Sequence, residues 1–266
     1  MSFDRWSYTL VIGGLGVVAM VLLAAPTLLV LITSLTSGET LRFPPPGFSA
    51  RWYEALIFSS PDIVDAAIVS LKVAASATLV ATVLATAAAV GIAASDRGWA
   101  RVAETALMSP VLLPALSLAL GLLLTFNALK ISVSLATLIV GHVVIVFPFV
   151  LRTTLASLAQ IHPALEECAR DLGAGGWQTF VNVTLPLARG GIVAGAFIGF
   201  MASFDNVAIS LFLADARSEV LPIRLWDLLE SVLDVRAAAA SGVLIAATMA
   251  LMIVIERMAG LSRYVR

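Results

Sequence analysis

The chain has 266 residues, of which 60% are hydrophobic and only 12% are charged, and its formal net charge is −1. Several continuous apolar runs exceed the ~18 residues that mark a membrane-spanning helix, which excludes a soluble globular protein. We therefore expect a polytopic all-α membrane protein that forms one domain over residues 1–266. The near-neutral charge gives no indication of nucleic-acid binding.

Hydropathy predicts about six spans. The first is interpreted as a retained span, because its apolar run is too long for the core of a signal peptide. The third contains Pro110 and Pro114 in its first half, where freed backbone carbonyls are tolerated only against protein or a water-filled path. The second is rich in small residues and is expected to be buried in the bundle. The predicted spans cover about residues 10–33, 66–94, 103–129, 132–155, 190–213 and 237–261.

The connection between the first two spans contains a proline run and then a cluster of aromatic residues. Pro44, Pro45 and Pro46 precede Gly47, and this sequence predicts a rigid extended turn. Trp52 and Tyr53 follow it, which is typical of an interfacial segment. We expect a short surface helix to begin near Ser49.

The longest polar interruption runs from Pro163 to Pro186. Pro163 stands where a helix can start and Gly173 where one should stop. A second short apolar face begins at Trp177, and Pro186 is expected to end it. The prediction is two short amphipathic helices joined by a glycine elbow, which suits either an interfacial loop or a docking element. The first helix has an apolar face of Leu165, Ala169 and Leu172 and a polar face of Glu166, Glu167, Arg170 and Asp171.

This interruption resembles the EAA loop of ABC-importer permeases. The sequence E-E-C-A-R-D-L-G ends at Gly173, and Leu185-Pro186 follows at the spacing of that motif. Cys168 stands at a usual alanine position, and as the only cysteine it excludes an internal disulfide; we expect it to be a small residue on a packed helix face. The resemblance implies a coupling loop over about residues 160–186 whose first helix docks on an ATPase. The implied coupling residues are Glu166, Glu167, Ala169, Arg170 and Gly173.

The fifth predicted span contains the sequence S-F-D-N. Because an aspartate is costly in hydrocarbon, Asp205 should face the bundle interior or an aqueous path. It then lies on a transport route, or it forms a polar helix contact or a cap at a break. Residues 201–222, with Leu221-Pro222 and the following Trp226, are similar to the C-terminal part of spermidine/putrescine-type permeases. This similarity implies a substrate path with Phe204, Asp205, Asn206 and Trp226.

Two departures from that pattern concern the substrate. Asn206 replaces a second acid, and the segment from Pro114 to Leu116 lacks the acid that follows the corresponding proline in relatives. A cation with two or more ammonium groups needs separated carboxylate or aromatic partners. The candidate substrates therefore remain a polyamine, a smaller amine, an amino-acid-like compound and a phosphonate.

No catalytic constellation is recognised in the sequence. His142 has no histidine, cysteine or acid at helical spacing, so a hydrogen-bonded packing role is favoured over a ligand or an intramembrane enzyme. There is no G-x-x-x-x-G-K-[ST] sequence, so we expect no catalytic residue, metal or cofactor in this chain. ATP and Mg would be bound by a partner ATPase.

Together, these resemblances imply the permease subunit of an ATP-driven, binding-protein-dependent importer with a type I importer fold. Its partners would be a second permease subunit in a heterodimer, two ATPase subunits, a periplasmic substrate-binding protein and membrane lipid. The location would be the bacterial inner membrane with both termini cytoplasmic. That orientation places nine positive residues inside and seven outside. A stand-alone secondary transporter is the alternative class, although no internal inverted repeat is evident.

Overall fold

The computed structural model describes residues 2–95, 97–215 and 217–259. Within these ranges the chain is helical, and the β-type pairings are two isolated bridges. Five of the described helices are long and apolar enough to cross a membrane, and a sharply bent helix pair makes a sixth candidate. The predicted all-α fold with about six spans is confirmed.

The chain divides into two compact units. One comprises residues 1–64 and 225–251, and the other comprises residues 65–224 and 252–266. The expectation that residues 1–266 form one permease domain stays a prediction.

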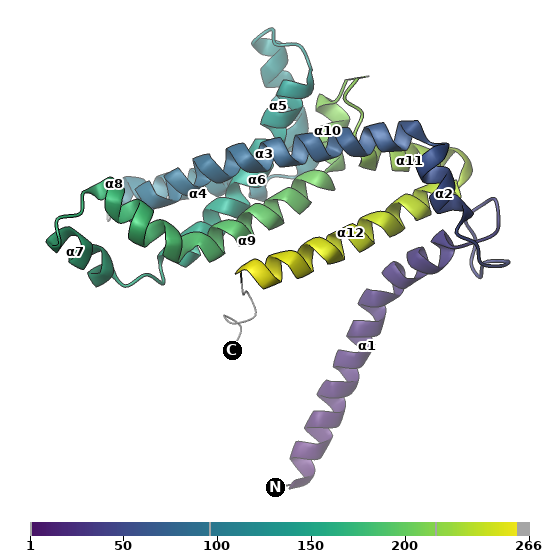
Figure 1. Cartoon of the computed structure of the whole chain (residues 1–266), viewed down its shortest axis with the longest axis horizontal. Coiled ribbons are helices and arrows are strands. Elements are labelled where there is room, and N and C mark those ends of the chain that lie inside the picture. The colour runs from purple at the N-terminus through teal and green to yellow at the C-terminus, as the bar shows by residue number, and fades with distance from the viewer. Residues whose placement is uncertain (1, 96, 216, 260–266) are drawn as a thin grey trace. The chain divides into compact units, whose positions relative to one another are not determined.

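The first unit holds α1 (Ser2–Ser34), α2 (Arg51–Phe58), the end of α11 (Leu221–Val232) and most of α12 (Val235–Ala259) (Figure 1). The proline run lies in a non-helical loop, as predicted. Trp52 Nε1 donates to the Gly38 carbonyl over 3.0 Å, and Tyr53 Oη lies 2.7 Å from Ser34 Oγ. These bonds hold the loop and α2 against the end of α1.

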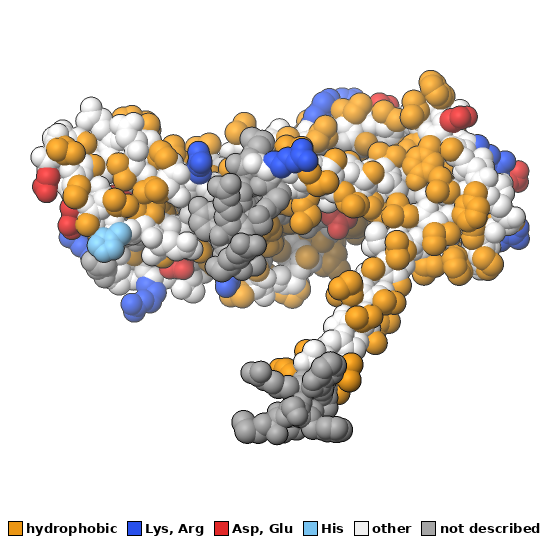
Figure 2. Space-filling model, turned by 60° about the horizontal axis from the view of Figure 1, so that its bottom comes forward, with side chains coloured by type: hydrophobic (Ala, Val, Ile, Leu, Met, Phe, Trp, Pro, Cys, Tyr) orange, Lys and Arg blue, Asp and Glu red, His pale blue; other side chains and the backbone are white. Residues whose placement is uncertain are grey.

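Helix α1 is apolar and is largely exposed within its own unit. Its candidate span, Tyr8–Ser34, has a mean hydropathy of 2.7, and Leu23 is 80% exposed. Figure 2 shows apolar side chains along this helix. A long apolar helix needs lipid or other protein to cover it.

The second unit is built on α3 (Pro61–Ala93) and α6 (Leu135–Leu158). Ala81, Ala85 and Ala89 of α3 are fully buried and belong to one core cluster with Val146 and Val150 of α6. Small side chains let the two backbones approach closely. The prediction of burial through small residues holds for this face of α3, whereas Leu79 (69% exposed) and Val83 (63% exposed) lie on its other side.

Helix α9 (Leu185–Phe204) packs along α6 through glycines spaced four residues apart. A Cβ added at Gly195 would lie 2.8 Å from the Cα of Val150, and one at Gly199 would lie 2.5 Å from Val146 Cγ1. The contact therefore requires glycine at these positions. It brings the backbones of α6 and α9 close together.

The third predicted span, 103–129, is wrong as a single helix. It is divided into α4 (Gly98–Leu112) and α5 (Ala115–Ala128), which meet at 107°. Leu113 is extended (φ −86°, ψ 143°) because a residue before proline is driven out of the helical region. Pro110 stays inside α4, where the Ser109 hydroxyl donates over 2.7 Å to the Ala106 carbonyl that the proline leaves unpaired.

Candidate functional site

The predicted polar interruption begins with α7 (Pro163–Asp171) and the elbow that follows it. His162 caps the helix, since its Nδ1 accepts from the Ala164 N–H over 3.2 Å. At the other end Gly173 has φ +88°, and the N–H of Ala174 donates to the Ala169 carbonyl over 3.0 Å. This is a glycine-terminated helix end, which a residue with a side chain adopts at a cost. The predicted short helix and glycine elbow are confirmed.

None of the residues of α7 is buried. Glu167 and Cys168 are exposed, so Cys168 does not lie on a face packed against its own chain, contrary to expectation. Beyond the helix Leu172 is 89% exposed and Trp177 is 75% exposed. Large apolar side chains at the tip of a polar segment are typical of an interaction surface.

Glu166 is the member of α7 that turns toward its own chain. Its Oε1 accepts a hydrogen bond from the Thr184 hydroxyl over 2.7 Å, and its Oε2 lies 3.2 Å from the Arg170 guanidinium. Thr184 is 6% exposed, whereas the Arg170 side chain is 60% exposed. The Thr184 bond therefore lies in the more protected environment, and the ion pair is largely solvated.

Thr184 ends a π-helical turn, which the sequence did not predict. After the elbow, α8 (Gly176–Thr179) passes into the π-helix η1 (Phe180–Thr184) and then directly into α9. Pro186 therefore does not end a short helix, and that prediction is wrong. Pro186 is one of the first two residues of α9, and the wider turn before it accepts a ring that would clash with a regular α-helical carbonyl.

A cavity of about 740 Å³ lies beside Glu166, within the second unit. Thr179 is 3% exposed, and its hydroxyl has no partner among the described residues. A buried hydroxyl at the wall of a cavity that also contains charged side chains is a natural position for water. The residues lining the cavity come from α3, α4, α6, α7, α8 and η1 and include Glu104, Glu166, Arg170, Thr179 and Thr184.

The predicted fifth span, 190–213, is interrupted at the S-F-D-N sequence, so its prediction as one helix is wrong. Helix α9 ends at Phe204, and α10 (Val207–Leu213) begins after the break. Asn206 Oδ1 accepts from the Ile209 N–H over 2.8 Å, which makes Asn206 the cap of α10. Asp205 is exposed, and the ring of Phe204 lies 6.0 Å from that of Phe200. The alternative of a cap at a break is thus realised by Asn206, while a path role for Asp205 stays a prediction.

The buried side chain of His142 in α6 contacts residues on both sides of this break. Its Nδ1 lies 2.8 Å from Ser203 Oγ and its Nε2 lies 3.2 Å from Ser210 Oγ, on either side of the break. All three side chains are at most 2% exposed. The hydrogen-bonded packing role predicted for His142 is confirmed.

Trp226, the fourth predicted path residue, belongs to α11 in the first unit. It is 62% exposed, and its Nε1 donates to Glu230 Oε2 over 3.1 Å. Its participation in a path with Asp205 stays a prediction.

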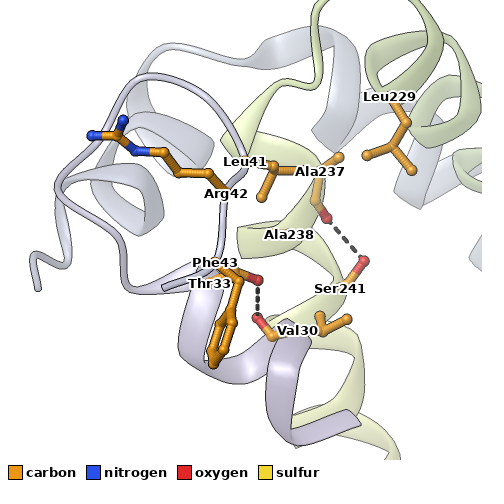
Figure 3. A pocket seen from close by; sticks show the side chains of 9 residues that line it. All are labelled: Val30, Thr33, Leu41, Arg42, Phe43, Leu229, Ala237, Ala238 and Ser241. Carbon is orange, nitrogen blue, oxygen red and sulfur yellow. Dashed lines mark hydrogen bonds between the residues drawn. The ribbon is translucent and has the colours of Figure 1, made fainter. Parts of the chain in front are cut away.

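The first unit also contains a pocket formed by α1, the loop that follows it, α11 and α12 (Figure 3). The hydrogen bonds drawn there, from Thr33 to the Val30 carbonyl and from Ser241 to the Ala237 carbonyl, both stay within one helix. Arg42 points away from the pocket. An apolar pocket without an inward charge is a poor site for a cation. Its lining comprises Val30, Thr33, Leu41, Arg42, Phe43, Leu229, Ala237, Ala238 and Ser241.

The helices, the exposed polar elbow and the broken span together define a multi-pass helical membrane protein. Residues 81–262 match the model of the family described as the binding-protein-dependent transport system inner membrane component. The chain belongs to this family, so it is an inner-membrane transport permease.

Known proteins of this kind resemble the chain over most of its length. The spermidine/putrescine transport system permease protein PotC of Haemophilus influenzae is 27% identical, over 85% of this chain and 88% of the relative. The putrescine transport system permease protein PotI of Escherichia coli is 29% identical, over 77% and 75%. Among solved structures, a bacterial ABC transporter for import of the polysaccharide alginate matches with a TM-score of 0.67 at 13% identity, covering 97% of both chains. The fold is that of an ABC importer permease.

Proposed function

We propose that the chain is one of two permease subunits in an ATP-driven importer of small organic amines of the spermidine/putrescine type. The observation that carries this proposal is the similarity, over three quarters of the chain or more, to permeases named for these substrates. The family match shows that the chain is a permease, and the amine substrate is what we propose beyond it.

In the proposed assembly a second permease subunit completes the path, and two ATPase subunits bind ATP and Mg. A periplasmic binding protein delivers the substrate. Both termini and α7 face the cytoplasm, so that α7 docks on an ATPase through Glu167, Ala169 and Arg170. The exposed Leu172 and Trp177 support this role, because a docked subunit would bury them.

The proposed path passes the break after α9. Asp205 supplies an exposed carboxylate there, and the neighbouring Phe204 supplies an aromatic face. Both favour an ammonium group that has lost part of its water. Because Asn206 is an uncharged amide that caps α10, Asp205 is the one acid of the S-F-D-N break, and a compound with a single ammonium is the second candidate substrate.

The test is uptake by the reconstituted complex. The chain is co-expressed with a candidate second permease, ATPase and binding protein, and purified complexes are placed in proteoliposomes. We expect ATP-dependent uptake of labelled putrescine or spermidine that requires the binding protein. An amine with one ammonium, an amino acid and an aminophosphonate serve as comparison substrates. Uptake that needs no ATPase would support a stand-alone transporter and contradict the proposal.

A further inference from the structure

We propose that Glu166 is a positioning residue that ties α7 to the base of α9 through Thr184, so that the two elements move as one body. The tie joins residues 18 positions apart through a 2.7 Å hydrogen bond to a carboxylate oxygen. Hydrogen bonds to charged acceptors are about twice as strong as neutral ones.

The tie is needed because the backbone between the two elements is a weak mechanical link. The elbow contains Gly173, Gly175 and Gly176, and glycine restricts the backbone least. Helix α7 itself has no buried residue to anchor it. A side-chain bond across the elbow gives the helix an attachment that the connecting backbone does not provide.

The tie reaches α9 at an irregular turn. Thr184 is the last residue of η1, whose wide turn is closed by the bond from the Leu185 N–H to the Phe180 carbonyl. π-helical turns occur as single irregular turns within helices and are frequent at functional sites. A displacement of α7 is therefore passed to α9 at its irregular first turn, directly before Pro186.

The two neighbouring glutamates divide their tasks. Glu166 is directed into its own chain, whereas Glu167 is exposed and has no hydrogen bond or ion pair within the described residues. Glu167 is thus available to a docked subunit. Glu166 acts on transport through Thr184, without touching substrate or nucleotide.

The direct test uses Cys168, the only cysteine of the chain and an exposed residue of α7. A nitroxide attached there in the full-length chain, held in lipid nanodiscs, reports the mobility of α7. Thr184→Val removes the hydroxyl at nearly constant shape, and Thr184→Ser retains it. We expect Thr184→Val to raise the mobile fraction of the label about tenfold, as the loss of one charge-assisted bond implies, and Thr184→Ser to restore the original line shape.

Arg170→Gln is the matched control, because it removes the solvated ion pair and leaves the Thr184 bond intact. This variant should change mobility by less than about twofold. An unchanged line shape in Thr184→Val, or an equal effect of Arg170→Gln, would overturn the proposal.

The functional readout rests on the proposed transport role. In the reconstituted complex, Glu166→Ala and Thr184→Val should each lower the substrate moved per ATP hydrolysed about tenfold, with the ATPase still bound. The double variant should be no worse than either single variant, since both remove one bond. Additive losses of transport in the double variant, or dissociation of the ATPase from either variant, would contradict the proposed tie. If the unmodified chain moves no amine, the proposed substrate fails, while the label measurement still decides the tie.

Discussion

The two ends of α9 are each held by a side chain from another helix, but in opposite environments. At the end that begins with Leu185, Glu166 of the exposed helix α7 bonds Thr184. At the end that stops at Phe204, His142 of the core helix α6 bonds Ser203 and Ser210. One attachment belongs to an element with no buried residue, and the other is almost fully buried. The helix therefore has one end that can follow an external movement and one end that is anchored.

The largest effect is expected at the elbow of the movable end. Gly173→Val should reduce uptake to background, because a β-branched residue is strongly disfavoured at φ +88°. The space around its Cβ is open, so the effect comes from the backbone and not from a clash. Uptake into proteoliposomes and membrane insertion are measured together.

Gly173→Asn is the control, since asparagine tolerates the left-handed region better than other residues with a side chain. It should retain a substantial part of the activity. Equal loss in both variants would show that the conformation of the elbow is not what matters.

The anchored end should respond through stability. His142→Phe keeps a ring but leaves the buried Ser203 hydroxyl without the imidazole, while Ser210 retains its bond to the Asn206 carbonyl, at a cost of about 1–3 kcal/mol. Thermal unfolding of the purified chain in detergent should shift to a clearly lower temperature. Ser203→Ala removes one of the bonds and should cost less. If His142→Phe is as stable as the wild type, His142 does not anchor this end of α9.

Variants of Asp205 distinguish a role of the break in transport from its role in stability. Asp205→Asn should lower uptake of a cationic substrate about tenfold, the equivalent of ~1.4 kcal/mol, and leave the unfolding temperature unchanged because the side chain is exposed. Asp205→Glu keeps the charge and should retain most of the uptake. Unchanged uptake in Asp205→Asn would take this residue off the path.

The smallest effect is expected at Asn206. Asn206→Ala removes the cap of α10 and should cost about 1 kcal/mol of stability, with little change in uptake. Asn206→Asp keeps the cap and adds a second acid, so it should favour putrescine over an amine with one ammonium in a competition assay. A lower preference for putrescine would contradict a cation path at this break.

Much of the site was predictable because its signals are local. Pro163 and Gly173 mark the start and the elbow of α7 by their own backbone restrictions, and both are found as predicted. The third span was wrong as one helix because run length gives no signal for a break, whereas Pro114 drives Leu113 fully out of the helix. The role of Pro186 was missed because hydropathy carries no signal for a π-helical turn.

The sequence by itself determined that this is a helical membrane protein with five or six apolar spans and a polar elbow, since apolar run length and glycine or proline positions act within a few neighbouring residues. Only the tertiary structure decided that Glu166 turns to Thr184 while Glu167 stays exposed, and that His142 bridges the break after α9. Those pairings join residues 18 to 68 positions apart. They depend on how the helices pack, which residue spacing does not encode.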